Sequence, residues 1–189
     1  WIGDKMVNDV EPKDRDIAMV FQNYALYPHM SVYDNMAFGL KLRKVPKPEI
    51  DKMVKEAAKV LDLTALLDRK PKALSGGQRQ RAYIAMVIAQ DTEFILLDEP
   101  TNNLDIYHAT NLMKIIRKLS DELGKTVVTV LHEINYAAFY SDYICSFKDG
   151  RVAKFGTVDE VMTKEVLSEI YNVDFEIMNI QGRPLSIYY

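Results

Sequence analysis

The chain has 189 residues, 48% of them hydrophobic, which is enough to bury a core as one globular, soluble domain. Its 27 acidic residues outnumber its 24 Lys and Arg, so we expect no general attraction for nucleic acid or an anionic membrane. One cysteine, Cys145, excludes an intramolecular disulfide, and we expect it to pack in a half-buried strand. No apolar run reaches the roughly 20 residues that a membrane-spanning helix needs, so direct membrane insertion is not expected.

Three short apolar segments predict three strands, each followed by polar or charged residues. The segments are residues 16–21, 94–97 and 126–131. Gln22 follows the first segment, Asp98 and Glu99 follow the second, and His132 follows the third. Because ligands bind at the carboxyl edge of open α/β sheets, we expect these side chains to face one site.

Helical periodicity appears in the segments between these strands. The expected helices span residues 49–61, 78–90 and 106–123. Helices that alternate with apolar strands are typical of a parallel sheet with helical crossovers, so the expected fold class is α/β. After residue 132, hairpin signals at 148–150 and 181–183 and a capping-box spacing at Thr157 predict a small β-rich segment.

Asp98 and Glu99 form an acidic pair at the end of an apolar strand. Such a pair is costly to bury unless a cation or a proton transfer uses it. In nucleotide hydrolysis the first acid holds Mg²⁺ and the second polarises the attacking water, while a neighbouring amide and imidazole orient that water. Gln22 and His132 are candidates for these last two roles. The alternative is a surface turn with two solvated acids and a structural histidine.

The segment LSGGQRQR, residues 74–81, places two glycines at the start of a predicted helix. The Ser75 hydroxyl and the backbone N–H groups of Gly76 and Gly77 can bind an anion, because no Cβ blocks its approach and the helix start is partially positive. A simple N-capped helix start is the alternative, and Ser75 can serve both purposes.

The order Gln22, LSGGQ, LLDEP, LD and His132 resembles the ATP-binding subunit of an ABC transporter over nearly the whole chain. By that resemblance Glu99 is the catalytic base, Gln22 the Q-loop glutamine and His132 the switch histidine. Asp98 is the Walker B aspartate, which binds Mg²⁺ with Gln22, and Asp105 is the D-loop acid at the dimer interface. The resemblance implies ATP and Mg²⁺ as cofactors.

The same resemblance assigns the signature motif to Ser75, Gly76, Gly77 and Gln78. In the family the signature binds the γ-phosphate of ATP held by a second ATPase subunit in a head-to-tail dimer. The implied fold is a partial P-loop ATPase core with a helical signature subdomain. We expect one truncated domain over residues 1–189, with core in 1–22, helical subdomain in 23–90 and core again in 91–189.

The region after the Q-loop receives the transmembrane permease subunits in this family. The segment 23–42 is rich in Tyr, Met and Phe, which anchor interfaces when exposed, although core packing is their commoner fate. Tyr24, Tyr27 and Pro28 are expected to contact the permease, and the implied location is cytoplasmic, peripheral at the inner face of the membrane. His29 and His108 have no acid or metal partner in view, so we expect ordinary surface roles for both.

Two finer resemblances differ along the chain. Residues 1–81 resemble the ATPase of carbohydrate importers, whereas residues 82–189 resemble the ATPase of iron-siderophore importers. One hypothesis is a chimera joined at the shared LSGGQRQR string. The alternative is one importer subfamily that combines both sets of features.

The phosphate-cradling pattern G-x-x-x-x-G-K-[ST] does not occur in these 189 residues. We therefore expect this chain alone to bind ATP weakly and to hydrolyse it negligibly, although the family is an ATPase family. The rival hypothesis is a non-catalytic interaction module that supplies its signature in trans or docks on a membrane subunit. A third option, an ABC ATPase of translation or DNA repair, lacks support because the long insertions of such proteins are absent.

Overall fold

A computed structural model describes residues 1–11, 14–20, 26–102 and 104–188 of the chain. Gln22 and Tyr24 lie outside these residues. The chain forms two compact units, Trp1–Val130 and Leu131–Tyr189. The boundary between the units, after residue 130, is not one of the two expected boundaries, after residues 22 and 90. The expected subdivision into core and helical subdomain remains a prediction. No helix in the described part of the chain combines the length and apolar character needed to cross a membrane.

The first unit is a three-stranded parallel sheet with helices. Its elements are β1 (Ile17–Val20), α1 (Val32–Leu42), α2 (Lys47–Val60), η2 (Thr64–Leu66), η3 (Pro71–Ala73), α3 (Gly76–Ile88), β2 (Phe94–Asp98), α4 (Ile106–Asp121) and β3 (Thr126–Val130). The strands lie in the order β1-β2-β3, and Ala18 pairs with Ile95, which pairs with Val127. The predicted α/β class with a parallel sheet is confirmed, and strand and helix bounds differ from expectation by one or two residues.

The two faces of this sheet have different environments. Ala18, Ile95 and Leu97 are buried on one face, where α3 contacts β1 and α4 contacts β3. Side chains alternate along a strand, so the intervening residues point to the other face. On that face Met19 and Val128 are 46% and 53% exposed. The helices of the described residues therefore cover one face of the sheet and leave apolar side chains on the other.

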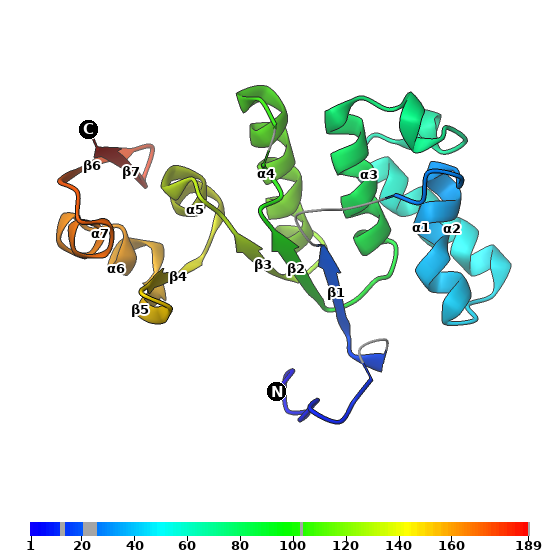
Figure 1. Cartoon of the computed structure of the whole chain (residues 1–189), viewed down its shortest axis with the longest axis horizontal. Helices are drawn as coiled ribbons and strands as arrows, with labels where there is room; N and C mark the ends of the chain where they lie inside the picture. Colours follow the sequence, from blue (N-terminus) through cyan, green and yellow to red (C-terminus); the bar gives the residue numbers. More distant parts are fainter. Residues whose placement is uncertain (12–13, 21–25, 103, 189) are drawn as a thin grey trace. The chain divides into compact units, whose positions relative to one another are not determined.

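Helices α1, α2 and α3 contact one another and bury a core of their own (Figure 1). Its fully buried residues include Val32, Met36, Leu40, Leu61 and Ile84. Helix α1 lies within the aromatic-rich segment for which the sequence indicated partner contact and no helix. Its start is fixed by Ser31, whose hydroxyl accepts a hydrogen bond from the backbone N–H of Asp34 at 3.0 Å.

The second unit contains short helices and two antiparallel hairpins. Its elements are α5 (Ile134–Tyr140), β4 (Tyr143–Lys148), β5 (Arg151–Thr157), α6 (Val158–Val161), α7 (Lys164–Tyr171), β6 (Phe175–Ile180) and β7 (Arg183–Tyr188). The hairpins β4–β5 and β6–β7 are those that the sequence predicts. The capping box at Thr157 is also confirmed, whereas α5 and α7 were not predicted.

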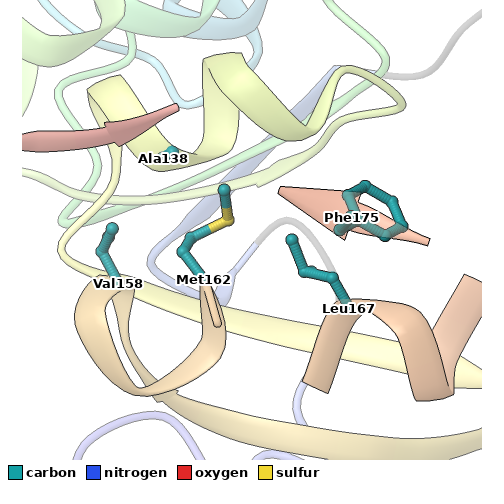
Figure 2. Close-up of a cluster of buried hydrophobic side chains, with 5 residues drawn as sticks. All are labelled: Ala138, Val158, Met162, Leu167 and Phe175. Carbon is teal, nitrogen blue, oxygen red and sulfur yellow. The ribbon is translucent and has the colours of Figure 1, made fainter. Parts of the chain in front are cut away.

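The core of the second unit gathers side chains from α5, α6, α7 and β6. Figure 2 shows its buried members, which are Ala138, Val158, Met162, Leu167 and Phe175. The expectation for Cys145 is wrong, because the thiol is exposed. Cys145 lies two residues from each of the exposed Tyr143 and Phe147 along β4, so it shares their outward face of the hairpin.

Candidate functional site

The acidic pair stands at the carboxyl end of β2, as expected. Asp98 is the last residue of the strand, and the Glu99 backbone N–H donates to the Val130 carbonyl at 3.2 Å. Glu99 has a φ of 48°, in the left-handed region that non-glycine residues rarely adopt. The Asn102 amide Nδ2 donates to Glu99 Oε2 at 3.2 Å. A strained backbone and an amide donor therefore fix the direction of the Glu99 carboxylate.

The Asp98 carboxylate suits a cation that brings most of its own ligands. It is half-buried, and within the described ranges no side chain or N–H group forms an ion pair or a hydrogen bond with it. Those ranges also hold no group of three or more His, Cys, Asp or Glu able to bind a metal. Mg²⁺ in nucleotide sites commonly uses one or two carboxylates together with water and phosphates, so a single strand-end aspartate fits it.

The signature segment begins helix α3 as an N-capped helix start. The Gln78 backbone N–H donates to Ser75 Oγ at 3.3 Å, and the Ser75 backbone N–H donates to Gln78 Oε1 at 3.0 Å. This reciprocal capping box satisfies two backbone donors at the helix start. Gly76 is exposed, and no atom of another element lies within 4 Å of where its Cβ would be. The start of α3 is thus open on the Gly76 side.

The signature helix touches the acidic turn. The Gln80 amide Nε2 donates at 2.7 Å to the carbonyl of Pro100, the residue directly after the acidic pair. Gln80 lies one helical turn after Gly76 and Gly77, so the contact ties the first turns of α3 to the end of β2. The hydrogen bond therefore links the helix that begins at the signature to the residue that follows the acidic pair.

Asp105 caps the next helix and holds a histidine. Its Oδ1 accepts from the His108 backbone N–H at 2.8 Å, and His108 Nδ1 lies 2.9 Å and 2.8 Å from the two carboxylate oxygens. The hydrogen bond from the His108 backbone, followed by that from its side chain, lowers the pKa of Asp105. The expectation of an ordinary surface role for His108 is wrong, because the residue has an acid partner. An Asp at an N-cap with His three residues later is the sequence signal for it.

The structure describes some of the remaining predicted site residues and not others. His132 is exposed and belongs to the second unit, and Gln22 lies outside the described residues, so their approach to Glu99 remains a prediction. Tyr27 and Pro28 are exposed in the loop before α1, and Tyr24 is outside the described residues. Sequence reasoning missed Asn35, a buried amide whose Oδ1 accepts from the Tyr27 backbone N–H at 2.7 Å.

Comparisons with known proteins agree with the motifs. A sequence model of the family described as ABC transporter matches residues 2–102. The oligosaccharides import ATP-binding protein MsmX of Bacillus subtilis is 55% identical over 161 residues, 85% of this chain and 44% of that protein. The trehalose/maltose import ATP-binding protein MalK of Thermococcus litoralis is 49% identical over 170 residues, 87% of this chain and 46% of that protein. The chain thus spans less than half the length of these relatives.

Solved structures share the fold. An inward-facing ABC transporter of metal-chelate type has a TM-score of 0.80 and 26% identity, covering 92% of this chain and 71% of that one. The cbiO1 protein of Clostridium perfringens, part of the ABC transporter complex cbiONQ, has a TM-score of 0.73 and 33% identity, covering 83% and 63%. Both likenesses support a P-loop ATPase fold.

The resemblance to sugar importers is supported by these relatives. A match over 85% of the chain continues past residue 81, so the carbohydrate-importer likeness is not confined to the first part. The siderophore-importer resemblance of residues 82–189 and the chimera remain hypotheses. Three findings agree: the family match over residues 2–102, the identity of about half to importer ATP-binding proteins, and the shared fold. This chain therefore belongs to the ABC transporter family of ATP-binding domains.

Proposed function

We propose that the chain is the part of an ABC importer's ATP-hydrolysing subunit that carries the signature and the Walker B acids. ATP hydrolysis and nucleotide binding are properties of this family. The observation that carries the proposal is the hydrogen bond of 2.7 Å from Gln80 to Pro100, because it joins the signature helix to the acidic turn. A solvated surface turn, the alternative for the acids, gives no reason for this link.

Each acid has a distinct task in the proposed reaction. Glu99 accepts a hydrogen bond from the attacking water, with Asn102 holding one oxygen of its carboxylate and thereby its orientation. By the family resemblance, Gln22 and His132 would orient the attacking water. Asp98, together with Gln22, would hold Mg²⁺, which when bound neutralises the charge that develops on the transferred phosphate.

The signature acts on a second subunit. Ser75, Gly76, Gly77 and Gln78 bind the γ-phosphate of ATP held by another ATPase subunit in a head-to-tail dimer, and Asp105 lies at the same interface. Support comes from the open, capped start of α3 and from its contact with the helix that Asp105 caps. The remaining partners are transmembrane permease subunits, contacted through Tyr24, Tyr27 and Pro28. The subunit is then peripheral at the cytoplasmic face of the membrane.

The names of the relatives support a proposal for the solute class. Proteins named for the import of oligosaccharides, of trehalose and maltose, and of sn-glycerol-3-phosphate are 49% to 55% identical to this chain. We therefore assign a carbohydrate or polyol solute to the transporter in preference to an iron-siderophore.

A fusion protein tests the catalytic proposal. The segment of the 55% identical relative that contains its phosphate-binding loop is joined before Trp1, and hydrolysis of Mg-ATP is measured as phosphate release. The fusion should hydrolyse ATP, and Glu99→Gln should lower the rate more than about 100-fold while ATP binding persists. Glu93→Gln is the matched control, because this exposed acid directly precedes the first residue of β2, at the end of the strand away from Glu99. Equal rates for wild type and Glu99→Gln contradict the assignment.

A second candidate is an interaction module that supplies its signature in trans. The open start of α3, where no described atom of another element lies within 4 Å of the place of a Gly76 Cβ, favours it. Mixing the unfused chain with a full-length ATPase whose signature serine is replaced separates the two functions. Restored hydrolysis supports the module, whereas unchanged inactivity, with an active fusion, supports the catalytic subunit. Isothermal titration of the chain alone with Mg-ATP should give no tight isotherm.

A further inference from the structure

We propose that His108 is a positioning residue that locks the start of the signature helix against the D-loop acid, and that Gly77 is a glycine because the His108 ring occupies the place of its side chain. The contact between the His108 ring and Gly77 does not depend on the proposed function. The expected effect on ATP hydrolysis rests on the proposed function.

Asp105 fixes the orientation of the His108 imidazole. Asp105 and His108 are linked by two contacts, one from the backbone N–H and one from Nδ1, both to the same carboxylate. An ionised carboxylate only accepts hydrogen bonds, so Nδ1 must carry the proton in the neutral ring. The Asp105 cap therefore fixes both the rotation of the ring and its tautomer, and it leaves Nε2 as an acceptor.

The His108 ring fits closely against Gly77. A Cβ at Gly77 would lie 2.6 Å from His108 Cδ2 and 3.2 Å from His108 Nε2. Real side chains do not approach that closely, so any residue but glycine must push the ring away from Asp105 or shift α3. Glycine is the least favourable residue for a helix apart from proline, and the steric contact with His108 supplies a reason for it at this position in addition to anion approach.

The close contact with another element is made by Gly77 and not by the neighbouring Gly76. Gly76 precedes Gly77 in the same turn, yet no atom of another element would lie within 4 Å of its Cβ. Gln80, which follows Gly77 by three residues on the same helix face, donates to the Pro100 carbonyl. One face of the first two turns of α3 is thus held at two points, by His108 and by the acidic turn.

The consequence concerns the placement of the signature amides. A ring displaced from Gly77 lets the first turn of α3 shift, and catalytic geometry is sensitive to displacements of about 1 Å. His108 touches neither nucleotide nor water in this proposal. It acts through Gly77 and Asp105.

A double-mutant cycle in the 189-residue chain tests the fit. Gly77→Ala should lower the urea midpoint in the wild-type background but leave it unchanged or raise it in the His108→Ala background, where the space is vacant. Gly76→Ala is the matched control and should have the same effect in both backgrounds, because its Cβ meets nothing. Equal effects of Gly77→Ala in the two backgrounds overturn the proposal.

The tautomer gives a second readout that does not depend on the stability of a variant. Long-range proton–nitrogen spectra of the wild-type chain, at a pH where the imidazoles are neutral, should show the Nδ1–H form for His108. The Nε2–H form for the wild type overturns the proposal. Gly77→Ala should move the His108 nitrogen shifts, and Gly76→Ala should not.

The catalytic effect is measured in the fusion protein. His108→Ala should lower kcat for ATP about tenfold with an unchanged KM, because the ring positions the signature and does not bind the nucleotide. Lys114→Ala, an exposed change farther along α4, is the control. A wild-type kcat for His108→Ala, in an active fusion, reduces His108 to a structural contact and overturns the positioning role. An inactive wild-type fusion instead contradicts the proposed function, while the cycle and the tautomer still decide the geometry.

Discussion

Asn35 shows how one buried amide organises a loop that precedes a helix. It is 1% exposed, and its Nδ2 donates to the carbonyls of Ser31 and Tyr27 at 2.8 Å and 3.3 Å, while its Oδ1 accepts from the Tyr27 backbone N–H. These bonds close the loop on the first turn of α1. The same loop presents Tyr27 and Pro28, for which we propose permease contact.

Asn35→Ala should lower the free energy of unfolding by about 2 kcal/mol, because it removes a buried amide and leaves the partly buried Tyr27 N–H without its acceptor. Urea denaturation followed by far-ultraviolet circular dichroism measures the change. Asn8→Ala, an exposed change of the same type, should have a small effect. A loss at Asn35 no larger than that at Asn8 contradicts the role of the amide.

At the scale of elements, the start of α6 depends on an ionised side chain. Glu160 Oε2 accepts from the Thr157 backbone N–H at 2.8 Å and from the Thr157 hydroxyl at 3.0 Å. The backbone hydrogen bond, followed by the hydroxyl, lowers the pKa of Glu160. A lowered folded-state pKa contributes stability that is present above the unfolded pKa and is lost as the pH falls through the folded pKa.

The Glu160→Gln variant isolates that contribution. The stability difference between wild type and variant should be largest near neutral pH and should shrink as the pH falls below about 4.5, where the unfolded carboxyl begins to protonate. Denaturation curves at a series of pH values measure it. A difference that stays constant or grows toward acid pH is incompatible with the capping role of the carboxylate.

Sequence patterns predicted the elements whose signals are local. The apolar strands with acids at their ends, the Asp149-Gly150 turn and the Thr157 capping box depend on neighbouring residues, and all are present. Helix α1 was missed because residues 23–42 were considered for partner contact or core packing and not for helical periodicity, although Ser31 and Asp34 signal an N-cap.

The errors concern information that alternation and spacing do not carry. A strand pattern separates two faces but does not say which one is covered, so Cys145 was assigned to the wrong environment. His108 was set aside because its partner, Asp105, was considered only as a D-loop acid. The three-residue spacing becomes a contact only once Asp105 is an N-cap.

At the scale of the whole chain, each compact unit buries side chains of its own. Leu167 is 1% exposed in the cluster of the second unit, and Leu97 is 1% exposed under the sheet of the first. Removing either side chain leaves a cavity that costs about 2–5 kcal/mol.

Leu167→Ala should therefore raise amide hydrogen exchange in residues 131–189 more than in residues 1–130. Leu97→Ala should give the opposite pattern, so the two variants control for each other. Exchange followed by mass spectrometry resolves the two regions. Uniform acceleration over the whole chain by both variants would show that the units open together.

The left-handed backbone at Glu99 lowers the stability of the fold at the residue for which we propose a catalytic role. A non-glycine residue with a φ of 48° costs about 1–2 kcal/mol, which glycine would avoid. A library selected only for resistance to heat or protease should therefore replace this acid with glycine or asparagine. The variants that survive longest in such a selection would be those that have lost the carboxylate for which we propose the activation of water.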